Sequence, residues 1–388
     1  MQLSAQVKLQ PTTEQETLLL RTLWAANAAC NYASHVAWTT RTFRRFPLQQ
    51  RCYQDLRARF GLGAQMAIRV LAKVADAYRM DRQTERTFRS QGSVAFDRRN
   101  LSWAVATETV SLWTLEGRQR IPYVCGKRQA DLLARQNGET DLAYRDGTFY
   151  LLTTCEVPEA GLQTMGEVLG VDVGLKNIAY DSDGRRYAGG HALGLRYRHR
   201  RLRHRLQVKH TKSAKRLLRK RSRREHRFMA DVNHCVSKQL VTTAQDTRRA
   251  IALEDLTGIR RRVSVRRRQR VTLHAWAFGQ LRTFVEYKAT LRGVPVILVD
   301  PRNTSRTCPQ CGHIGKANRK TQAQFLCVRC GFAGPADHIA PENIRRAAVN
   351  QPHAACDDVK APHRRSRLAG GRTATERSCK PSAGAESC

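Results

Sequence analysis

Acidic residues are scarce in this sequence. Its 388 residues include 32 Asp and Glu against 69 Lys and Arg, which gives a formal net charge of +37. A merely soluble basic surface does not require so large an imbalance, and a polyanionic partner, above all nucleic acid, explains it better. Long hydrophobic runs are missing too: no eighteen consecutive residues are apolar, and no amphipathic anchor flanked by basic residues occurs. We therefore expect a protein that binds nucleic acid and not a membrane.

A signal-peptide pattern is also missing, and eight of the 12 cysteines lie scattered along the chain. Both observations favour free thiols in a reducing compartment over disulfides. The other four cysteines form two Cys-x-x-Cys pairs separated by fifteen residues: Cys308 with Cys311, and Cys327 with Cys330. This spacing is typical of tetrahedral Zn²⁺, and four thiolates leave no position open for water. The sequence predicts one structural Zn²⁺, with disulfides as the alternative.

In the first half of the chain, hydrophobic periodicity predicts strands on either side of a helical insertion. "MQLSAQVKLQP" alternates like a strand, and Thr13 and Glu16 form a capping box ahead of the helix "TLLLRTLWAANAACNYASHVAW". A second helix is predicted in "AQMAIRVLAKVADAYRM". Residues 101–157 then show short alternating runs, with a hairpin that turns at Asp146-Gly147.

The second half follows the order β-β-β-α-β-α-β-α from Gly166 onward. Three strands, the last two joined by an Asp183-Gly184 turn, precede a basic helix pair over residues 196–245. The strand "RAIALEDL", the helix "LHAWAFGQLRTFVEYKATLRG", the strand "VPVILVDP" and the helix "DHIAPENIRRAAVN" follow. Residues 351–388 are polar and predicted to be disordered. The pattern predicts an α/β domain in this half.

Three acidic residues occupy key places in this order. Asp172 lies in the apolar strand "LGVDVG", Glu254 ends the strand "IALE", and Asp337 begins the last helix. Because an acid within a buried strand is costly without a cation or hydrogen bonds, we expect the three to meet at the carboxyl edge of one sheet. Carboxylate oxygens from separate elements suit a pair of Mg²⁺ ions, which activate water and stabilise the leaving oxygen of a phosphodiester.

Each acid also has a plainer interpretation. Asp172 is compatible with a hydrogen bond in the turn that follows it, Glu254 with an ion pair to Arg260 or a simple strand end, and Asp337 with a helix N-cap. The joint pattern favours the metal site. The nearest competitors are Asp255, Asp300 and Asp231. Asp300 precedes a proline in a loop and Asp231 lies within a basic helix, so we rank these two below the triad.

At these residues the sequence resembles a family. "GVDVGLKNIA", "IALEDLTGI" and "ADHIAPENI" resemble the three RuvC-type nuclease motifs of TnpB, the OrfB-type transposon-encoded proteins, which are similar to compact type V CRISPR effectors. "MADVNHCVSKQLV", "WAFGQLRTFVEYKA" and "NTSRTCPQCG" are similar to the segments that connect those motifs. The resemblance covers residues 166–344. The N-terminal half matches only in the order of its elements, which are an early strand, a helical insertion and a β region. Two positions depart from the last motif: Ile339 stands where the family usually has Asn, and Pro341 replaces a common Ala.

The resemblance implies an RNA-guided, Mg²⁺-dependent DNA endonuclease of the bacterial cytoplasm, acting at the nucleoid as a monomer or homodimer. Its partners would be a guide RNA derived from the transposon end and target double-stranded DNA, cut beside a short transposon-adjacent motif. Carried over by position, the catalytic residues would be Asp172, Glu254 and Asp337. Two Mg²⁺ ions and one structural Zn²⁺ would be its cofactors. Ile339 would remove a polar neighbour of the metal site, whereas Pro341 is expected in the first helical turn, where proline is tolerated.

The resemblance also implies a fold that combines α/β, β-barrel and helical parts. An N-terminal wedge-like barrel (residues 1–12 and 96–160) would be interrupted by a helical recognition domain (13–95). An RNase H-like, RuvC-type nuclease domain (161–305 and 333–350) would contain an inserted zinc ribbon (306–332), which we call the ribbon. Residues 351–388 would form the disordered tail.

The positive charge is concentrated in two runs, "RYRHRRLRHRLQVKHTKSAKRLLRKRSRREHR" and "RRRVSVRRRQR". A solvated helical face is the usual explanation, but a run with almost no compensating acid would repel itself without a polyanion. We expect these runs to hold the phosphates of a guide–target heteroduplex. Trp24, Trp38 and Tyr78 are more simply core residues than base-stacking platforms. The predicted nucleic-acid contacts are Lys176, Arg198, Arg201, Arg205, Lys215, Arg219, Arg260, Arg261 and Arg267.

Two other functions fit the same sequence. A protein of this fold that is guided but does not cut would act as a DNA-binding repressor or a transposition regulator, although an intact triad argues against it. A transposase would join strands itself, because related folds carry out both hydrolysis and strand transfer. The reaction product separates them: a free double-strand break, a joined strand, or intact DNA.

Overall fold

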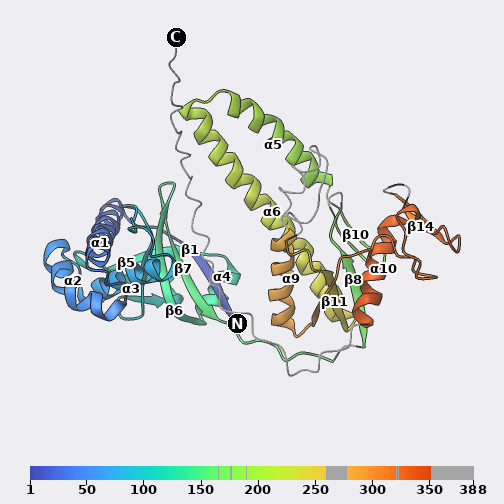
Figure 1. Ribbon diagram of the computed structural model, residues 1–388. Coiled ribbons are helices and arrows are strands. Elements are labelled where there is room, and N and C mark those ends of the chain that lie inside the picture. Colours follow the sequence, from blue (N-terminus) through green and yellow to red (C-terminus); the bar gives the residue numbers. More distant parts are fainter. Residues whose placement is uncertain are drawn as a thin grey trace, which may run out of the picture. The chain divides into compact units, whose positions relative to one another are not determined.

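The structure is a computed structural model of the 388-residue chain. It describes all residues except 165, 175–176, 189, 259–277, 320, 322 and 351–388. The helix predicted in "LHAWAFGQLRTFVEYKATLRG" begins at Leu273, so its first part, up to residue 277, lies outside the described residues. The predicted tail also lies outside them. The chain divides into two compact units (Figure 1). Unit 1 comprises Met1–Gln163 with Ala289–Gly293, and unit 2 comprises Thr164–Lys288 with Val294–Cys388.

Unit 1 combines a curved antiparallel sheet with helices. Its elements are β1 (Gln2–Leu9), α1 (Thr13–Thr39), α2 (Arg45–Phe60), α3 (Ala64–Met80), β2 (Val94–Phe96), β3 (Leu101–Ala104), the 3₁₀ turn η1 (Val105–Thr107), β4 (Thr109–Thr114), β5 (Gly117–Val124), α4 (Lys127–Leu133), β6 (Gln136–Arg145) and β7 (Thr148–Glu156). The seven strands form a nearly closed barrel in the order β2-β6-β7-β1-β5-β4-β3. The first strand thus pairs with β7, which lies far along the sequence.

The helices and the sheet of unit 1 share one apolar core. Leu23 of α1, Leu56 of α2 and Leu71 of α3 belong to the same buried cluster as Val7 of β1 and Leu151 of β7. The proposed boundary between a barrel and a helical recognition domain therefore falls inside one compact unit. Helices α2 and α4 were not predicted from the sequence.

The start of α1 differs from the prediction by one residue. Thr12 is the N-cap: its hydroxyl oxygen accepts a hydrogen bond from the Gln15 backbone N–H, and the Gln15 side-chain oxygen accepts one from the Thr12 backbone N–H. The predicted capping box of Thr13 and Glu16 is therefore wrong. Consecutive threonines followed by Gln15 and Glu16 offer two overlapping boxes, and the earlier one forms.

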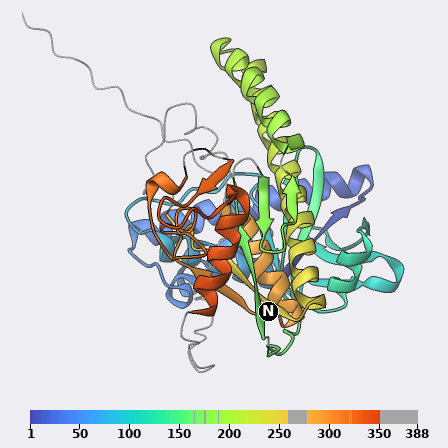
Figure 2. The same cartoon turned by 90° about the vertical axis from the view of Figure 1, so that its right-hand side faces the viewer.

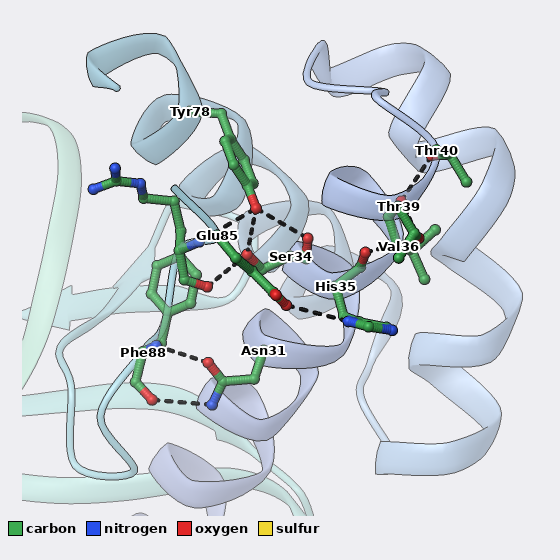
Figure 3. Close-up of polar contacts among 10 residues, drawn as sticks. Asn31, Ser34, His35, Val36, Thr39, Thr40, Tyr78, Glu85 and Phe88 are labelled. Atoms are coloured by element: carbon green, nitrogen blue, oxygen red, sulfur yellow. Dashed lines mark hydrogen bonds and ion pairs between the residues drawn. The ribbon is translucent and has the colours of Figure 1, made fainter. Parts of the chain in front are cut away.

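Polar side chains of α1 fasten the segment that leads from α3 to β2 (Figure 3). Asn31 donates to the Phe88 carbonyl oxygen at 3.0 Å and accepts from the Phe88 backbone N–H at 2.7 Å. Ser34 and Tyr78 are fully buried, and their hydroxyl oxygens lie 3.0 Å apart. His35 lies 3.2 Å from Glu85. Tyr78 is thus a core residue, as predicted, whereas Trp24 is 46% exposed.

The predicted hairpin at Asp146-Gly147 is present between β6 and β7. Both turn residues have positive φ, 52° for Asp146 and 80° for Gly147. This left-handed conformation is what a two-residue hairpin turn requires, and it explains the Asp-Gly pair in the sequence.

Unit 2 is built around a mixed five-stranded sheet. Its elements are β8 (Glu167–Asp172), β9 (Asn177–Asp181), β10 (Arg186–Ala188), α5 (Gly190–Val208), α6 (Lys212–Asp246), β11 (Arg249–Glu254), α9 (Phe278–Arg292), β12 (Val296–Val299), the 3₁₀ turn η2 (Lys316–Asn318), β13 (Gln324–Leu326), β14 (Ala333–Pro335) and α10 (Ala336–Val349). The sheet order is β10-β9-β8-β11-β12, with β8, β11 and β12 parallel. β13 and β14 form a separate small sheet.

Helix α10 packs directly on β8 (Figure 2). Gly170 of β8 makes this close approach possible. A Cβ atom at Gly170 would collide with the backbone of Pro341 and Arg345. Pro341 is the sixth residue of α10, so the prediction that it lies in the first turn is wrong. Because proline has no N–H, it cannot donate the usual helical hydrogen bond to the Asp337 carbonyl oxygen.

The predicted basic helix pair forms an antiparallel hairpin of α5 and α6 (Figure 1). Leu206 and Ala214, on either side of the connection, are buried. The later part of α6 packs against α9, where His234 stacks on Phe284 with ring centroids 3.8 Å apart. The hairpin begins at Gly190, six residues earlier than predicted. In the part of the chain that the structure describes, no helix has an apolar stretch that could span a bilayer.

Candidate active site

Two predicted acidic residues meet at the carboxyl ends of adjacent parallel strands. β8 ends with Asp172 and β11 ends with Glu254. The register pairs Leu253 with Val171, so the next step along both strands places Glu254 beside Asp172. Neighbouring strands lie about 4.8 Å apart, and side chains in register point to the same face. The two carboxylates are therefore neighbours at one sheet edge, as the strand order predicted.

The third predicted acid reaches this edge from α10. Asp337 is the second residue of that helix, and the N-cap is Pro335, without a side-chain cap. Asp337 is therefore not an N-cap. Its Oδ2 atom lies 3.4 Å from the Nδ2 atom of Asn177 at the start of β9, which points its donor at the carboxylate. Asn177 was not singled out from the sequence, although it lies within the first resembling motif.

Two of the three carboxylates, Asp172 and Glu254, have pKa values above the ordinary range. Burial raises the pKa of Asp172 to about 6, a nearby Arg319 opposes the rise, and the Asp337 charge adds to it. Burial likewise raises the pKa of Glu254 to about 7, with a further contribution from Asp172, while a hydrogen bond from Thr304 opposes it. Asp172 is thus the common electrostatic neighbour of the other two. Such mutual repulsion in a partly buried site is what a bound cation would relieve.

Arg319 comes from the ribbon, at the end of η2. Its effect on the pKa of Asp172 shows that the ribbon brings a guanidinium into electrostatic range of the carboxylates. Sequence reasoning missed this residue, because its position depends on how the ribbon folds over the sheet. The ribbon therefore contributes a charge to the candidate site in addition to its cysteines.

The competing acids lie in other environments. Asp255 accepts hydrogen bonds from Thr257 and from Arg282, which lies 2.8 Å away, and these interactions lower its pKa. Asp300 is exposed and lies 3.4 Å from Arg302, and Asp231 is exposed on α6. The alternative partner of Glu254, Arg260, lies outside the described residues. None of the three competitors shares the environment of the triad.

The four ribbon cysteines form a compact cluster. Their sulfur atoms all lie within 4.8 Å of one another, and the pairs Cys308–Cys330 and Cys311–Cys327 are 3.6 Å apart. A tetrahedron with metal–sulfur bonds of about 2.3 Å has edges of about 3.8 Å, whereas a disulfide bond is about 2.05 Å. The sulfur positions therefore fit Zn²⁺ and do not fit disulfides.

Backbone turns explain how the cysteines converge. Gly312 and Gly331, each following a Cys-x-x-Cys pair, have φ of 71° and 73°, and donate to the carbonyl oxygens of Cys308 and Cys327. The fully buried Asn318 then joins the two halves of the ribbon: it donates to the His313 carbonyl oxygen at 3.1 Å and accepts from the Val328 N–H at 3.1 Å. Asn318 was not predicted, since nothing in its local sequence marks it.

The predicted nucleic-acid contacts fall into two groups. Five are exposed on the α5–α6 hairpin: Arg198, Arg201, Arg205, Lys215 and Arg219. The first three line a hollow of about 890 Å³ along α5 together with Tyr197, Arg200 and His204. The other four, Lys176, Arg260, Arg261 and Arg267, lie outside the described residues. The hairpin thus presents a basic surface suited to phosphates.

Together these features define an α/β unit with three acids at a sheet edge and a four-cysteine ribbon beside them. A family model described as "Cas12f1-like, TNB domain" matches residues 278–344. A TnpB-like protein of Methanocaldococcus jannaschii is 37% identical over 131 residues, which cover 34% of this chain and 46% of that protein. The CRISPR-associated endodeoxyribonuclease Cas12f1 of Sulfoacidibacillus thermotolerans is 37% identical over 118 residues, or 30% of this chain and 26% of that protein.

A solved structure extends the likeness over most of the chain. Cas12f1 in complex with sgRNA and target DNA superposes with a TM-score of 0.56 at 14% sequence identity, and the match covers 86% of this chain and 83% of that one. This likeness shows a shared fold. The resemblance to TnpB-type proteins and to compact type V effectors is confirmed. In sequence, the chain matches less than half the length of each of the two curated relatives.

Proposed function

We propose that this protein is an RNA-guided, Mg²⁺-dependent DNA endonuclease encoded by a transposon, which cuts target DNA beside a short adjacent motif by a RuvC-type two-metal mechanism. The observation that carries the proposal is the convergence of Asp172, Glu254 and Asp337 at one sheet edge, with the pKa of Asp172 raised to about 6 and that of Glu254 to about 7. Acids held so close together in a partly buried site are costly unless a cation is bound.

The residues present fit Mg²⁺. All three are carboxylates, the hard oxygen ligands that this ion prefers, and they come from three separate elements. When bound there, two Mg²⁺ ions would lower the pKa of an attacking water and stabilise the leaving 3′-oxygen of the phosphodiester. Asp172 is the common electrostatic neighbour of the other two acids, which supports a role for it in holding the ions. Asn177 orients Asp337, and Thr304 orients Glu254.

The rest of the chain would hold the nucleic acids. The basic hairpin of α5 and α6 would neutralise phosphates of a guide–target heteroduplex, whose sequence is read by base pairing rather than by the protein. In this proposal residues 161–305 and 333–350 form the RuvC-type nuclease domain, and residues 306–332 the zinc ribbon. Residues 1–12 and 96–160 form a wedge-like barrel, residues 13–95 the recognition domain, and residues 351–388 a disordered tail. The Cas12f1 complex of similar fold contains an RNA and a DNA target, which supports this choice of partners.

The test begins with the RNA. The protein is purified from its host, the RNA that accompanies it is sequenced, and its guide segment is replaced by one that matches a plasmid. Cleavage is measured in Mg²⁺ for the wild type, Asp172→Ala and the matched control Asp300→Ala, with binding followed in parallel by filter retention. We expect cleavage by the wild type and by Asp300→Ala, and none by Asp172→Ala, with similar binding by all three, because the acid acts on the rate and many basic contacts provide the affinity.

Other products would point to other functions. Tight guided binding by a wild type that leaves the plasmid intact indicates a repressor or transposition regulator. A joined strand in place of a free double-strand break indicates a transposase. Cutting by Asp172→Ala at the wild-type rate would show that the nuclease site lies elsewhere.

A further inference from the structure

A buried threonine outside the triad holds one of its carboxylates. Thr304 lies between β12 and the ribbon and is 8% exposed. Its hydroxyl oxygen lies 2.6 Å from Oε1 of Glu254 and 3.3 Å from the Pro301 carbonyl oxygen. A hydroxyl has one hydrogen to donate, and the short contact to a carboxylate is the stronger of the two. Thr304 therefore fixes one Glu254 oxygen and leaves the other free to bind a ligand.

The position of Thr304 is in turn set by Asn343 of α10. Asn343 is also 8% exposed, and its Nδ2 atom donates to the Thr304 carbonyl oxygen at 2.7 Å and to the Thr307 carbonyl oxygen at 2.8 Å. Both amide hydrogens are thus used. The same turn is closed from its other side by Asn303, which has φ of 61° and accepts backbone hydrogen bonds from Arg306 and Thr307. Asn343 and Asn303 together hold the backbone of the turn that carries the Thr304 side chain.

This arrangement links two of the three acids through one helix. α10 carries Asp337 in its first turn and Asn343 six residues later. Asp337 joins the site directly, whereas Asn343 reaches Glu254 on β11 through Thr304. A shift of α10 would therefore move Asp337 and the support of Glu254 together.

We infer that Thr304 and Asn343 are a positioning pair that sets the orientation of the Glu254 carboxylate for metal binding. The inference rests on the proposed function, because it assigns Glu254 to a metal site. It adds two residues that act through Glu254 and do not themselves touch the metal. Groups that orient a ligand in this way typically affect metal affinity or activity by about 10- to 100-fold.

The first test measures Mn²⁺ binding by the full chain, using the electron paramagnetic resonance signal of free Mn²⁺. Thr304→Val keeps the shape of the side chain and removes the donor, so we expect Mn²⁺ to bind about tenfold or more weakly. Thr304→Ser restores the hydroxyl and should restore affinity. Thr283→Val is the matched control, because its exposed hydroxyl donates within α9 to the Gly279 carbonyl oxygen at 2.8 Å. Zinc content and the melting temperature are measured on every variant to confirm the fold.

The second test asks whether Asn343 acts through Thr304. Asn343→Ala should weaken Mn²⁺ binding in the same direction, and the double variant with Thr304→Val should be no weaker than Thr304→Val alone, because both changes remove one effect. Two independent packing defects would instead add. Wild-type affinity in Thr304→Val, or additive losses in the double variant, would overturn the inference.

The two proposals fail in distinguishable ways. A wild type that binds Mn²⁺ in a manner sensitive to Asp172 and Thr304, but cuts no guided target, would refute the nuclease proposal and leave the positioning pair intact. Guided cleavage together with Mn²⁺ affinity that is unchanged in Thr304→Val would support the nuclease proposal and refute the positioning pair. A wild type that binds no Mn²⁺ at these acids would overturn both.

Discussion

In the ribbon, sulfur atoms lie 3.6 Å apart in two pairs, and all four fall within 4.8 Å of one another. The three acids at the sheet edge do not reach that density: among the described residues, the cysteines form the only such compact group of ligand side chains. Local turns bring the four cysteine sulfur atoms together around a single point. The carboxylates are instead brought together from β8, β11 and α10 and repel one another.

In the proposed function, this difference separates a structural metal site from a reactive one. A closed shell of four thiolates excludes water and stabilises a fold. An open set of carboxylates can accept ions that also bind water and substrate oxygens. Removing a ligand should therefore cost stability in the first site and reaction rate in the second. The predictions below test that contrast, beginning with the largest expected effect.

The largest effect should follow a change at the sheet edge. Asp337→Asn keeps the size of the side chain and weakens metal ligation, so we expect guided cleavage to fall at least about a thousandfold, while nucleic-acid binding is retained. The melting temperature should stay the same or rise, because one of three mutually repelling charges is removed. Plasmid cleavage, filter retention and a thermal melt measure the three quantities. If Asp337→Asn lowered the melting temperature as well as the cleavage rate, the carboxylates would not differ from the ribbon in the way proposed.

A change in the ribbon should give the opposite result. Cys327→Ser removes one thiolate, so we expect zinc content to fall below one per chain and the ribbon to unfold, since metal binding supplies the folding free energy of such small sites. Zinc is measured by mass spectrometry and stability by a melt. Cys235→Ser, a change at an exposed cysteine of α6, is the control and should do neither. Retention of one zinc per chain by Cys327→Ser would rule out the ligand assignment.

Features that depend on residues close together in the sequence could be predicted, whereas features that depend on distant residues could not. The Cys-x-x-Cys pairs, the Asp-Gly hairpin turn and the acids at strand ends are set by neighbours within a few residues, so their types and spacing were visible. The missed helix α2 begins "RFP", with a proline at its third position, which the first helical turn tolerates although proline usually marks a break.

The residues that complete the candidate site could not be read in the same way. Thr304, Asn343, Asn177 and Arg319 act across separations that only the folded topology closes, such as the 50 positions between Thr304 and Glu254. Thr, Asn and Arg also occur throughout loops for reasons of turn geometry and solvation. Their roles become visible only when their partners are known.

A third prediction concerns the basic hairpin, where charge rather than shape should matter. Replacing Arg198, Arg201 and Arg205 by alanine should weaken nucleic-acid binding and lower the slope of log affinity against log salt by about 2 to 3, since each phosphate contact contributes about 0.7 to 0.9. Replacing the same three by lysine keeps the charge and should keep the slope. Binding titrations at several salt concentrations measure it. An unchanged slope in the alanine variant would exclude these residues from the contacts.

A smaller effect is expected when pH changes the charge of the acids. The folded-state pKa of Asp172 is about 6 and that of Glu254 about 7, both above their ordinary values. Their contribution to stability is therefore present below about pH 4 and is lost as pH rises through 6 and 7. Without Mg²⁺, the melting temperature should fall over that window, and added Mg²⁺ should restore it at about pH 8 but not at about pH 5.

The measurement is a thermal melt at both pH values, with and without Mg²⁺ and without chelator, so that zinc stays in the ribbon. Asp172→Asn should flatten the profile. Equal stabilisation by Mg²⁺ at both pH values would show that it binds elsewhere. Cleavage should also fall as pH drops through this window, because protons compete with the metal for the carboxylates.

The smallest effect on cleavage should come from Ile339. The sequence suggested that Ile339 removes a polar neighbour of the metal site. In the structure Ile339 is 4% exposed and belongs to the apolar cluster of Cys308, Phe325 and Cys327 in the ribbon. It follows Asp337 by two positions, about 200° around the helix, so the two side chains leave α10 on different sides. Ile339 therefore connects α10 to the ribbon.

Ile339→Asn would bury an amide among apolar side chains, and we expect it to lower the free energy of unfolding by about 1 to 3 kcal/mol without raising the cleavage rate. Ile339→Val, which removes one methyl group from the same place, should cost about 0.5 to 1.5 kcal/mol. Chemical denaturation and guided cleavage are measured on both variants under identical conditions. A faster cut by Ile339→Asn, with stability unchanged, would place residue 339 with the carboxylates after all. Destabilisation without a gain in rate would show that Ile339 supports the packing of the four-cysteine ribbon and not the carboxylate site.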